Sequence, residues 1–372
     1  MQYGTLGKTG LRVSRLGFGA MRLPMSGERV DRAAAIPLLH RAFELGVNYI
    51  DTAVNYCKGD SQRVVGEAVK SWPGEIIVST KNHYYGPVEK EWRRHLEESL
   101  ERLQLESIDV YNTHGLMGDR LDEAVRPRII KWLRAARDEG LIKHIGTSFH
   151  DNAALLRRVI DSDLYECVTV QYNLLDRKLE QAIAYACEKD VGVVIMGPIG
   201  GGRLAAPNEI LSKLLPDVTH MPELALRFVL SNPHVSIALS GMNTREQVEE
   251  NTAVASEAKA LSEAELKAIS GHMARLKRMA DSYCTGCGYC MPCPQEVNIP
   301  GVFGLYNTAK VYGLLEQARR KYAQWREKAP AHGMQADACI ECGKCEELCP
   351  QDIEIREQLK EAHHLLAPEE EE

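Results

Sequence analysis

The last quarter of the chain contains two runs of cysteines, and these runs restrict its fold more than any other feature. The first run repeats a cysteine at every third residue and ends in Cys293-Pro294. The second has the same spacing until one wider interval before Cys349-Pro350. Only three of the eleven cysteines precede residue 280. The cysteines of the two runs are Cys284, Cys287, Cys290, Cys293, Cys339, Cys342, Cys345 and Cys349.

This spacing favours metal over disulfides. Dense disulfides are typical of small secreted domains, whereas this chain has 372 residues and no apolar leader at its amino terminus. Three closely spaced cysteines can wrap one cubane cluster, and a fourth before proline comes from further along the chain. Zinc bound by paired Cys-x₂-Cys units would leave the third close cysteine and the Cys-Pro endings unexplained. The runs therefore predict two [4Fe-4S] clusters.

In two-cluster ferredoxins the fourth cysteine of each run binds the other cluster. This rule predicts that Cys349 joins Cys284, Cys287 and Cys290. It also predicts that Cys293 joins the second run's first three cysteines. The first run is one residue short of the ferredoxin spacing, which leaves the crossing open there. The helical pattern over 302–328 resembles the α-helical type of two-cluster ferredoxin.

Composition excludes several classes of function. Apolar residues make up 44% of the chain, enough for a large core, but no apolar run reaches bilayer-spanning length. A net charge of -7 gives no basic surface for nucleic acid. We therefore expect a cytoplasmic protein that binds neither membranes nor nucleic acid.

Eight apolar, β-branched runs precede the cysteines, and a polar or glycine-rich loop and a helical pattern follow each of them. Eight such units over about 250 residues favour an α/β fold, the closed (β/α)₈ TIM barrel. An open, doubly wound sheet is the alternative that periodicity leaves open. The runs cover residues 16–23, 47–53, 76–81, 108–114, 144–149, 167–173, 191–198 and 235–242.

Composition also suggests where the domains begin and end. Residues 2–6 and 11–14 flank a Gly-Lys-Thr-Gly turn and predict a hairpin that closes the barrel's amino-terminal end. Composition shifts to cysteine, glycine and proline near residue 280. We therefore expect a barrel over 1–279, a small α-helical ferredoxin-like domain over 280–366 and a solvated acidic tail over 367–372.

Titratable side chains lie at the ends of three consecutive barrel strands, where such barrels hold catalytic residues. Asp51 and Tyr56 follow the second run, Lys81 ends the third, and His114 ends the fourth. We expect Lys81 to lower the pKa of Tyr56, Asp51 to hold the lysine, and His114 to bind a substrate oxygen. Each residue alone has an ordinary structural role, but their shared position favours an active site.

This pattern resembles the aldo-keto reductase family over residues 1–275, from the hairpin through Gly17-Phe18-Gly19 to the four residues at the strand ends. The resemblance implies a barrel that binds a nicotinamide nucleotide without a Rossmann fold. It also implies that Tyr56 protonates the oxygen of a small carbonyl substrate while hydride reaches its carbon. Lys81 and Asp51 then tune the tyrosine, and His114 orients the carbonyl.

The resemblance further implies a site for NADP(H) or NAD(H). Ser148 and Gln171 match carboxamide contacts, and Glu250 and Asn251 match adenine contacts. The loops after the seventh and eighth strands suit phosphate, although a plain flexible loop over 197–202 stays an alternative. The implied cofactor residues are Gly19, Ala20, Met21, Asp51, Ser148, Gln171, Met196, Gly197, Pro198, Ile199, Gly201, Ser240, Gly241, Met242, Gln247, Glu250 and Asn251.

Some positions depart from the family pattern. Phe149 replaces an asparagine, Met196 replaces the aromatic residue that stacks on nicotinamide, and Arg245 is the basic residue near Gly241. Hydride also carries two electrons at once, whereas a cluster carries one, and we see no flavin site in the sequence. We favour a nicotinamide-dependent carbonyl reductase whose clusters serve a redox partner protein. A nicotinamide-independent iron–sulfur enzyme and an electron carrier with a scaffold barrel are the alternatives.

Overall fold

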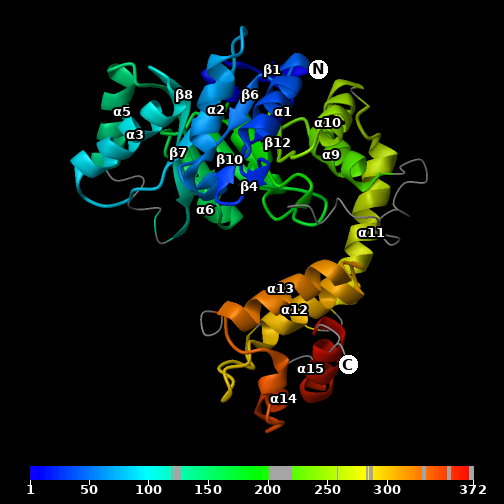
Figure 1. Ribbon diagram of the computed structural model, residues 1–372. Helices are drawn as coiled ribbons and strands as arrows, with labels where there is room; N and C mark the ends of the chain where they lie inside the picture. The colour runs from blue at the N-terminus through cyan, green and yellow to red at the C-terminus, as the bar shows by residue number, and fades with distance from the viewer. Residues whose placement is uncertain are drawn as a thin grey trace. The chain divides into compact units, whose positions relative to one another are not determined.

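The structure, a computed structural model, describes residues 1–118, 120, 127–200, 220–257, 259–281, 284, 288–328, 332–349 and 353–367. The chain forms two compact units (Figure 1). The first comprises Met1–Gly202 and Pro222–Leu261, and the second comprises Arg203–Met221 and Ser262–Glu372. We describe each unit by itself. The predicted domain boundary near residue 280 stays a prediction. Gly201, Cys287 and the acidic tail after Ala367 lie outside the described residues.

The first unit contains a closed barrel of eight parallel strands. Each strand overlaps one of the eight predicted runs, so the closed barrel is confirmed and the open sheet is wrong. The strands are β3 (Leu16–Gly19), β6 (Tyr49–Asp51), β7 (Ile77–Asn82), β8 (Ile108–Leu116), β9 (Ile142–Phe149), β10 (Cys167–Gln171), β11 (Gly192–Met196) and β12 (Ile237–Ser240).

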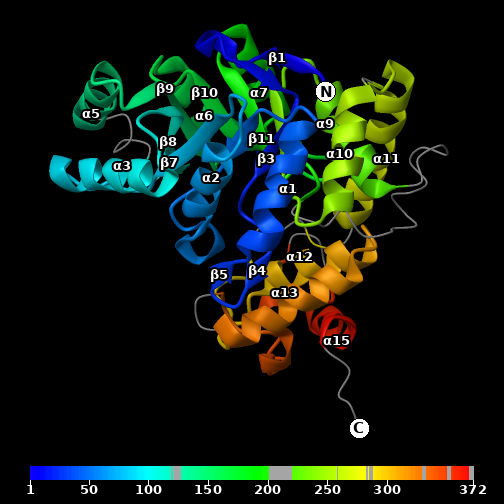
Figure 2. The ribbon, with the colours of Figure 1, turned by 45° about the horizontal axis from the view of Figure 1, so that its top comes forward.

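A helix follows each barrel strand and covers the outside of the barrel (Figure 2). In α3 (Glu89–Leu103), Trp92, Leu96 and Leu103 are buried at helical spacing, while glutamates and arginines form pairs on the other face. The other helices are α1 (Arg32–Glu44), α2 (Ser61–Lys70), α5 (Pro127–Asp138), α6 (Ala153–Asp161), α7 (Glu180–Glu188), α9 (Met221–Ser231) and α10 (Arg245–Glu257). A short hairpin, β4 (Met25–Ser26) and β5 (Arg29–Val30), precedes α1.

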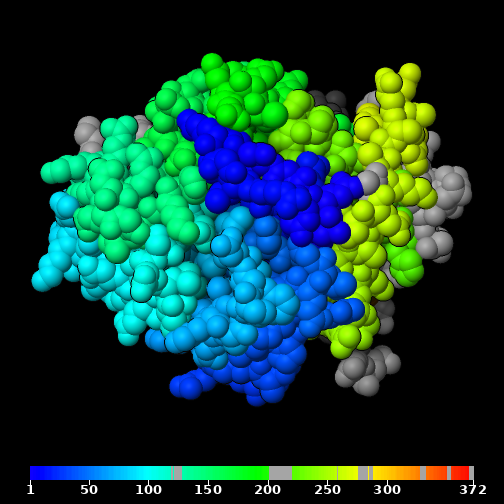
Figure 3. Space-filling view, turned by 90° about the horizontal axis from the view of Figure 1, so that it is seen from above, coloured from blue at the N-terminus to red at the C-terminus, as the bar shows by residue number. Residues whose placement is uncertain are grey.

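The predicted amino-terminal hairpin consists of β1 (Tyr3–Thr5) and β2 (Arg12–Ser14), which pair antiparallel. It lies across the amino-terminal end of the barrel (Figure 3). Leu6 and Val13 are fully buried against residues that begin barrel strands, including Tyr49 and Cys167. At Gly7, whose φ is +47°, an added Cβ would lie 2.2 Å from the backbone nitrogen of Gly192, so only glycine fits there.

The second unit is helical, as the pattern over 302–328 predicts. Its apolar core includes residues of three helices. Tyr322 lies in this core, and its hydroxyl contacts His363 Nδ1 at 2.8 Å and accepts from the Ala336 amide at 3.0 Å. No helix among the described residues is long and apolar enough to cross a bilayer. The unit contains α11 (Glu263–Asp281), α12 (Ile299–Lys310), α13 (Leu315–Lys328), η4 (Ala336–Ala338), α14 (Lys344–Glu347) and α15 (Ile355–Leu366).

Candidate active site and candidate metal centres

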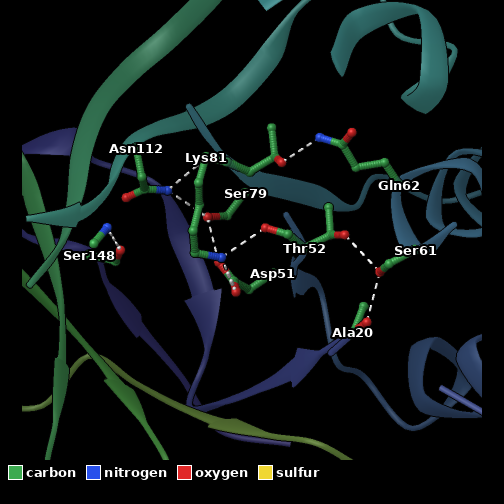
Figure 4. Close-up of polar contacts among 11 residues, drawn as sticks. Ala20, Asp51, Thr52, Ser61, Gln62, Ser79, Lys81, Asn112 and Ser148 are labelled. Carbon is green, nitrogen blue, oxygen red and sulfur yellow. Dashed lines mark hydrogen bonds and ion pairs between the residues drawn. The ribbon is translucent and has the colours of Figure 1, made fainter. Parts of the chain in front are cut away.

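A buried ion pair lies at the carboxyl end of two neighbouring strands. Asp51 is the last residue of β6, and Lys81 lies near the end of β7, which pairs with it. Lys81 Nζ donates to Asp51 Oδ1 at 2.6 Å and to the carbonyl of Thr52 at 2.8 Å (Figure 4). The two residues are only 2% and 4% exposed, so each charge depends on the other.

Two further polar residues hold this pair in place. Ser79 Oγ donates to Asp51 Oδ2 at 3.0 Å, and Asn112 Nδ2 donates to Ser79 Oγ at 3.0 Å (Figure 4). The sequence prediction missed both residues. Alternation along the strands was the available signal, because Ser79 shares a strand face with Lys81 and Asn112 shares one with His114.

Tyr56 begins η2 (Tyr56–Gly59), a short 3₁₀ turn after β6. Its ring centroid lies 4.7 Å from Lys81 Nζ, and the His114 ring meets it edge-on with 6.3 Å between centroids. The two residues after it, Cys57 and Lys58, have φ values of 49° and 55°, in the left-handed region that side chains rarely adopt. The structure thus brings together Asp51, Tyr56, Lys81 and His114, as the sequence predicted. We call this end of the barrel, where the four residues lie, the rim.

The electrostatics of the rim differ from expectation at one residue. Burial raises the pKa of Tyr56, and the opposing effect of Lys81 is too small to reverse it. Lys81 does act to lower this pKa, as expected, but burial outweighs it and the net shift is upward. Burial would also lower the pKa of Lys81, but Asp51 and Tyr56 outweigh it and raise that pKa. Burial, with Lys81 nearby, lowers the pKa of His114 to about 3, so its imidazole is neutral at physiological pH.

The residues matched to carboxamide contacts lie on neighbouring strands. Ser148 is buried in β9, and its Oγ accepts from the Gly115 amide at 2.8 Å. Gln171 ends β10 beside Gly197, where an added Cβ would lie 2.9 Å from Gln171 Nε2. Met196 ends β11 and is followed by Gly197, Pro198 and Ile199.

Two glycines leave bare backbone at the ends of adjacent strands. A Cβ on Gly19, at the end of β3, would lie 3.6 Å from the Gly241 nitrogen, and a Cβ on Gly241 would lie 3.6 Å from the Gly19 oxygen. The side chain of Arg22 also lies here, 3.7 Å from the same Cβ position on Gly241. The sequence prediction missed this arginine. Arg245, which it did identify, donates to Glu249 at 3.0 Å.

The amino terminus of α10 borders this backbone. Half of a capping box is present, because the Gln247 amide donates to Thr244 Oγ1 at 3.3 Å, while Gln247 Oε1 accepts from the amide of the preceding Asn243 at 2.9 Å. Asn251 Nδ2 donates to Ser240 Oγ at 3.1 Å. Bare backbone beside a helix amino terminus fits a dinucleotide with a pyrophosphate. The remaining implied residues are neighbours in sequence of Gly19, Gly241 and Asn251: Ala20, Met21, Met242 and Glu250.

In the second unit, five cysteines line one cavity of about 120 Å³. Two come from the first run and three from the second: Cys290, Cys293, Cys339, Cys342 and Cys345. Among the described residues, no three ligand side chains converge on a single metal ion. Thiols that line a cavity fit a cluster of several atoms. Cys284 and Cys349, like Cys290, pack partly buried against the core of this unit.

Comparison with known proteins identifies both parts of the chain. Residues 15–274 match the Aldo/keto reductase family, and residues 283–354 match a 4Fe-4S dicluster domain. L-galactose dehydrogenase from Arabidopsis thaliana is 31% identical over 286 residues, which cover 69% of this chain and 88% of the relative. NADH-specific methylglyoxal reductase from Escherichia coli is 26% identical over 307 residues, 67% of this chain and 91% of the relative.

Solved structures also resemble the barrel part of this chain. An aldo-keto reductase from Bacillus halodurans in its holo form aligns with a TM-score of 0.64 and 29% identity, covering 73% of this chain and 96% of that one. The family match spans more than half of the chain, and it contains all four rim residues. The chain therefore belongs to the aldo/keto reductase family and is an oxidoreductase that carries a 4Fe-4S dicluster domain.

Proposed function

We propose that this protein reduces an aldehyde or ketone with NADPH or NADH and that two [4Fe-4S] clusters link the reaction to single-electron transfer. The observation that carries the proposal is the buried Lys81–Asp51 pair, which faces Tyr56 with His114 at the next strand end. The relatives named as a dehydrogenase and a methylglyoxal reductase support this class of reaction.

The rim residues divide the proton chemistry between them. Because burial raises the pKa of Tyr56, the phenol keeps its proton at neutral pH and donates it to the carbonyl oxygen. Lys81 stabilises the negative charge left on the tyrosine, and Asp51 holds the lysine. Neutral His114 orients the carbonyl oxygen by hydrogen bonding. A nicotinamide held at this site would supply hydride to the carbon.

Ser148 and Gln171 hold the carboxamide in this proposal, and the backbone around Gly19 and Gly241 accommodates the pyrophosphate. Cys284, Cys287, Cys290 and Cys349 bind one cluster, and Cys339, Cys342, Cys345 and Cys293 bind the other. The cavity that Cys293 shares with three cysteines of the second run supports this crossing, and Cys290, assigned to the other cluster, lines the same cavity. The clusters would pass single electrons to a redox partner protein.

Replacing Tyr56 with phenylalanine tests the enzymatic part. The variant keeps the ring but lacks the proton donor, so aldehyde reduction should fall by a factor of at least about 100. Nucleotide binding, followed by fluorescence titration, should stay within about twofold of the wild type. Unchanged turnover in Tyr56→Phe would remove this residue from the mechanism.

A nicotinamide-independent iron–sulfur enzyme is the second candidate. It is favoured by Met196, which stands at the end of β11 where the family places an aromatic residue. An anaerobic visible spectrum before and after NADPH or NADH separates the candidates. Bleaching of the cluster absorbance would show that nicotinamide feeds the clusters and favour the first candidate. No bleaching, together with no nucleotide binding, would favour the second.

A further inference from the structure

The charges at the bottom of the candidate active site cancel. Lys81 is paired with Asp51, the Tyr56 phenol keeps its proton, and His114 is neutral. A neutral carbonyl compound therefore meets no net charge there. A substrate that carries its own charge needs a separate counterion, which would have to lie outside the Asp51–Lys81 pair.

Arg120 is a charged residue close to His114 and outside the Asp51–Lys81 pair. It belongs to the turn after β8, and its amide donates to the Met117 carbonyl at 2.9 Å. Its Nη1 donates to the Gly115 carbonyl at 3.4 Å, one residue beyond His114. Its guanidinium carbon also lies 5.4 Å from the ring centroid of Tyr85. The Tyr85 hydroxyl in turn donates to the His114 carbonyl at 2.8 Å, so all these groups are close to the rim.

The guanidinium has no ion-pair partner among the described residues, unlike Arg32, which pairs with Asp60, or Arg93, which pairs with Glu139. Asp151 does approach the same turn. Its carboxylate, however, accepts from the Gly118 amide at 2.8 Å and the Asn152 amide at 2.7 Å. Arg120 is exposed, and no described residue accepts from its remaining N–H groups.

We infer that the substrate is a carbonyl compound with an ionised carboxylate, which Arg120 binds while Tyr56 and His114 hold the carbonyl. This inference rests on the proposed function. The planar guanidinium offers two parallel N–H donors that match the two oxygens of a carboxylate. In the reaction the carbonyl carbon gains hydride and the oxygen gains the Tyr56 proton. The carboxylate is unchanged and leaves with the alcohol.

Steady-state kinetics on the full, cluster-loaded protein test the inference. The substrates are 2-, 3- and 4-carboxybenzaldehyde, each paired with its methyl ester, which differs only in charge and one methyl group. At least one acid should exceed its ester by about tenfold or more in kcat/KM. Arg120→Gln should abolish that preference chiefly through KM, and Arg120→Lys should restore part of it. Equal losses for acid and ester would overturn the inference.

Arg157→Gln is the matched control. Arg157 lies in α6 with its guanidinium carbon 4.7 Å from the Tyr185 ring centroid, so it makes the same kind of contact away from the rim. This variant should keep the preference for the acid. Calorimetric titration with benzoate separates the two proposals, because it needs no turnover. Binding that weakens about tenfold in Arg120→Gln supports the inference even if no aldehyde is reduced, and unchanged or absent binding overturns it.

Discussion

Lys81 shows what a single buried charge demands of its surroundings. The side chain is almost fully enclosed, and its ammonium group donates to the Asp51 carboxylate and the Thr52 carbonyl (Figure 4). Removing one member of such a pair leaves the other as an uncompensated buried charge. The cost of losing it therefore exceeds the strength of the interaction itself.

Lys81→Met should accordingly destabilise the barrel by about 3–5 kcal/mol, since Asp51 would lose its counterion. Chemical unfolding followed by circular dichroism measures the change. Lys143→Met is the control, because Lys143 pairs with Asp109 at 2.8 Å but its side chain is 56% exposed, and such pairs contribute less than about 1 kcal/mol. Equal losses in the two variants would refute this account of the buried pair.

His114 should make stability depend on pH. Its pKa is about 3 in the folded protein against 6.5 when unfolded, chiefly because of burial, so the unfolded chain binds the proton first. The stability it contributes is complete above pH 6.5 and is lost as the pH falls toward 3. Between pH 7.5 and 5.5, wild type should therefore lose about 1 kcal/mol more than His114→Gln.

Urea unfolding at the two pH values provides the measurement. Burial also lowers the pKa values of His83, His95 and His150, so only the difference between wild type and variant belongs to His114. Parallel pH dependence in the two proteins would mean that His114 is protonated as readily when folded as when unfolded.

The residue scale also shows where prediction from sequence stops. Asp51, Tyr56, Lys81 and His114 could be identified because strand order fixes which ends are neighbours. The sign of the Tyr56 pKa shift could not, because it depends on burial, which spacing along the chain does not measure. Arg22 was missed for a related reason. Its place beside Gly241 depends on the closure of the barrel between β12 and β3.

At the scale of elements, the repeated strand–helix pattern predicted all eight barrel strands, and the Gly-Lys-Thr-Gly turn predicted the hairpin. Hydrophobic periodicity works here because parallel barrel strands are buried on both faces and read as continuous apolar runs. The η2 turn after β6 was not predicted. Its left-handed residues are Cys57 and Lys58, neither of which is glycine or asparagine, so the usual turn signal is missing.

The packing of α2 on α3 depends on one glycine. A Cβ at Gly66 would lie 2.4 Å from the backbone oxygen of Leu103, so Gly66→Ala should push the helices apart and cost about 1–3 kcal/mol. In the control Gly271→Ala, within α11, nothing lies within 4 Å of the new methyl group, and helix propensity should add up to about 1 kcal/mol. Thermal unfolding compares the two, and a stabilised Gly66→Ala would contradict the packing argument.

At the scale of the whole molecule, each unit has an apolar core of its own. Six of the cluster cysteines pack against the core of the second unit, whereas the barrel closes where β12 pairs with β3. The two kinds of chemistry can therefore be removed separately. The cysteine runs predicted the cluster-binding part because ligand spacing is a local property of the chain, which needs no knowledge of tertiary packing.

Cys345→Ala should lose about half of the bound iron, since each of two cubanes holds the same number of iron atoms. The barrel should unfold at an unchanged temperature. Iron analysis and thermal circular dichroism check both expectations. Cys187→Ala, which removes an exposed cysteine of α7, should keep all the iron. Complete loss of iron in Cys345→Ala would mean that the two clusters assemble only together.

The hairpin that carries Leu6 and Val13 covers the amino-terminal end of the barrel, which leaves the carboxyl-terminal end as the side from which ligands can enter. A substrate and its product must then use the same opening, and in the proposed reaction the outgoing alcohol would block the incoming carbonyl compound. The product should therefore inhibit competitively with respect to the substrate. Mutations in the hairpin can change the stability of the barrel, but substrate selectivity depends on the residues at the opposite end.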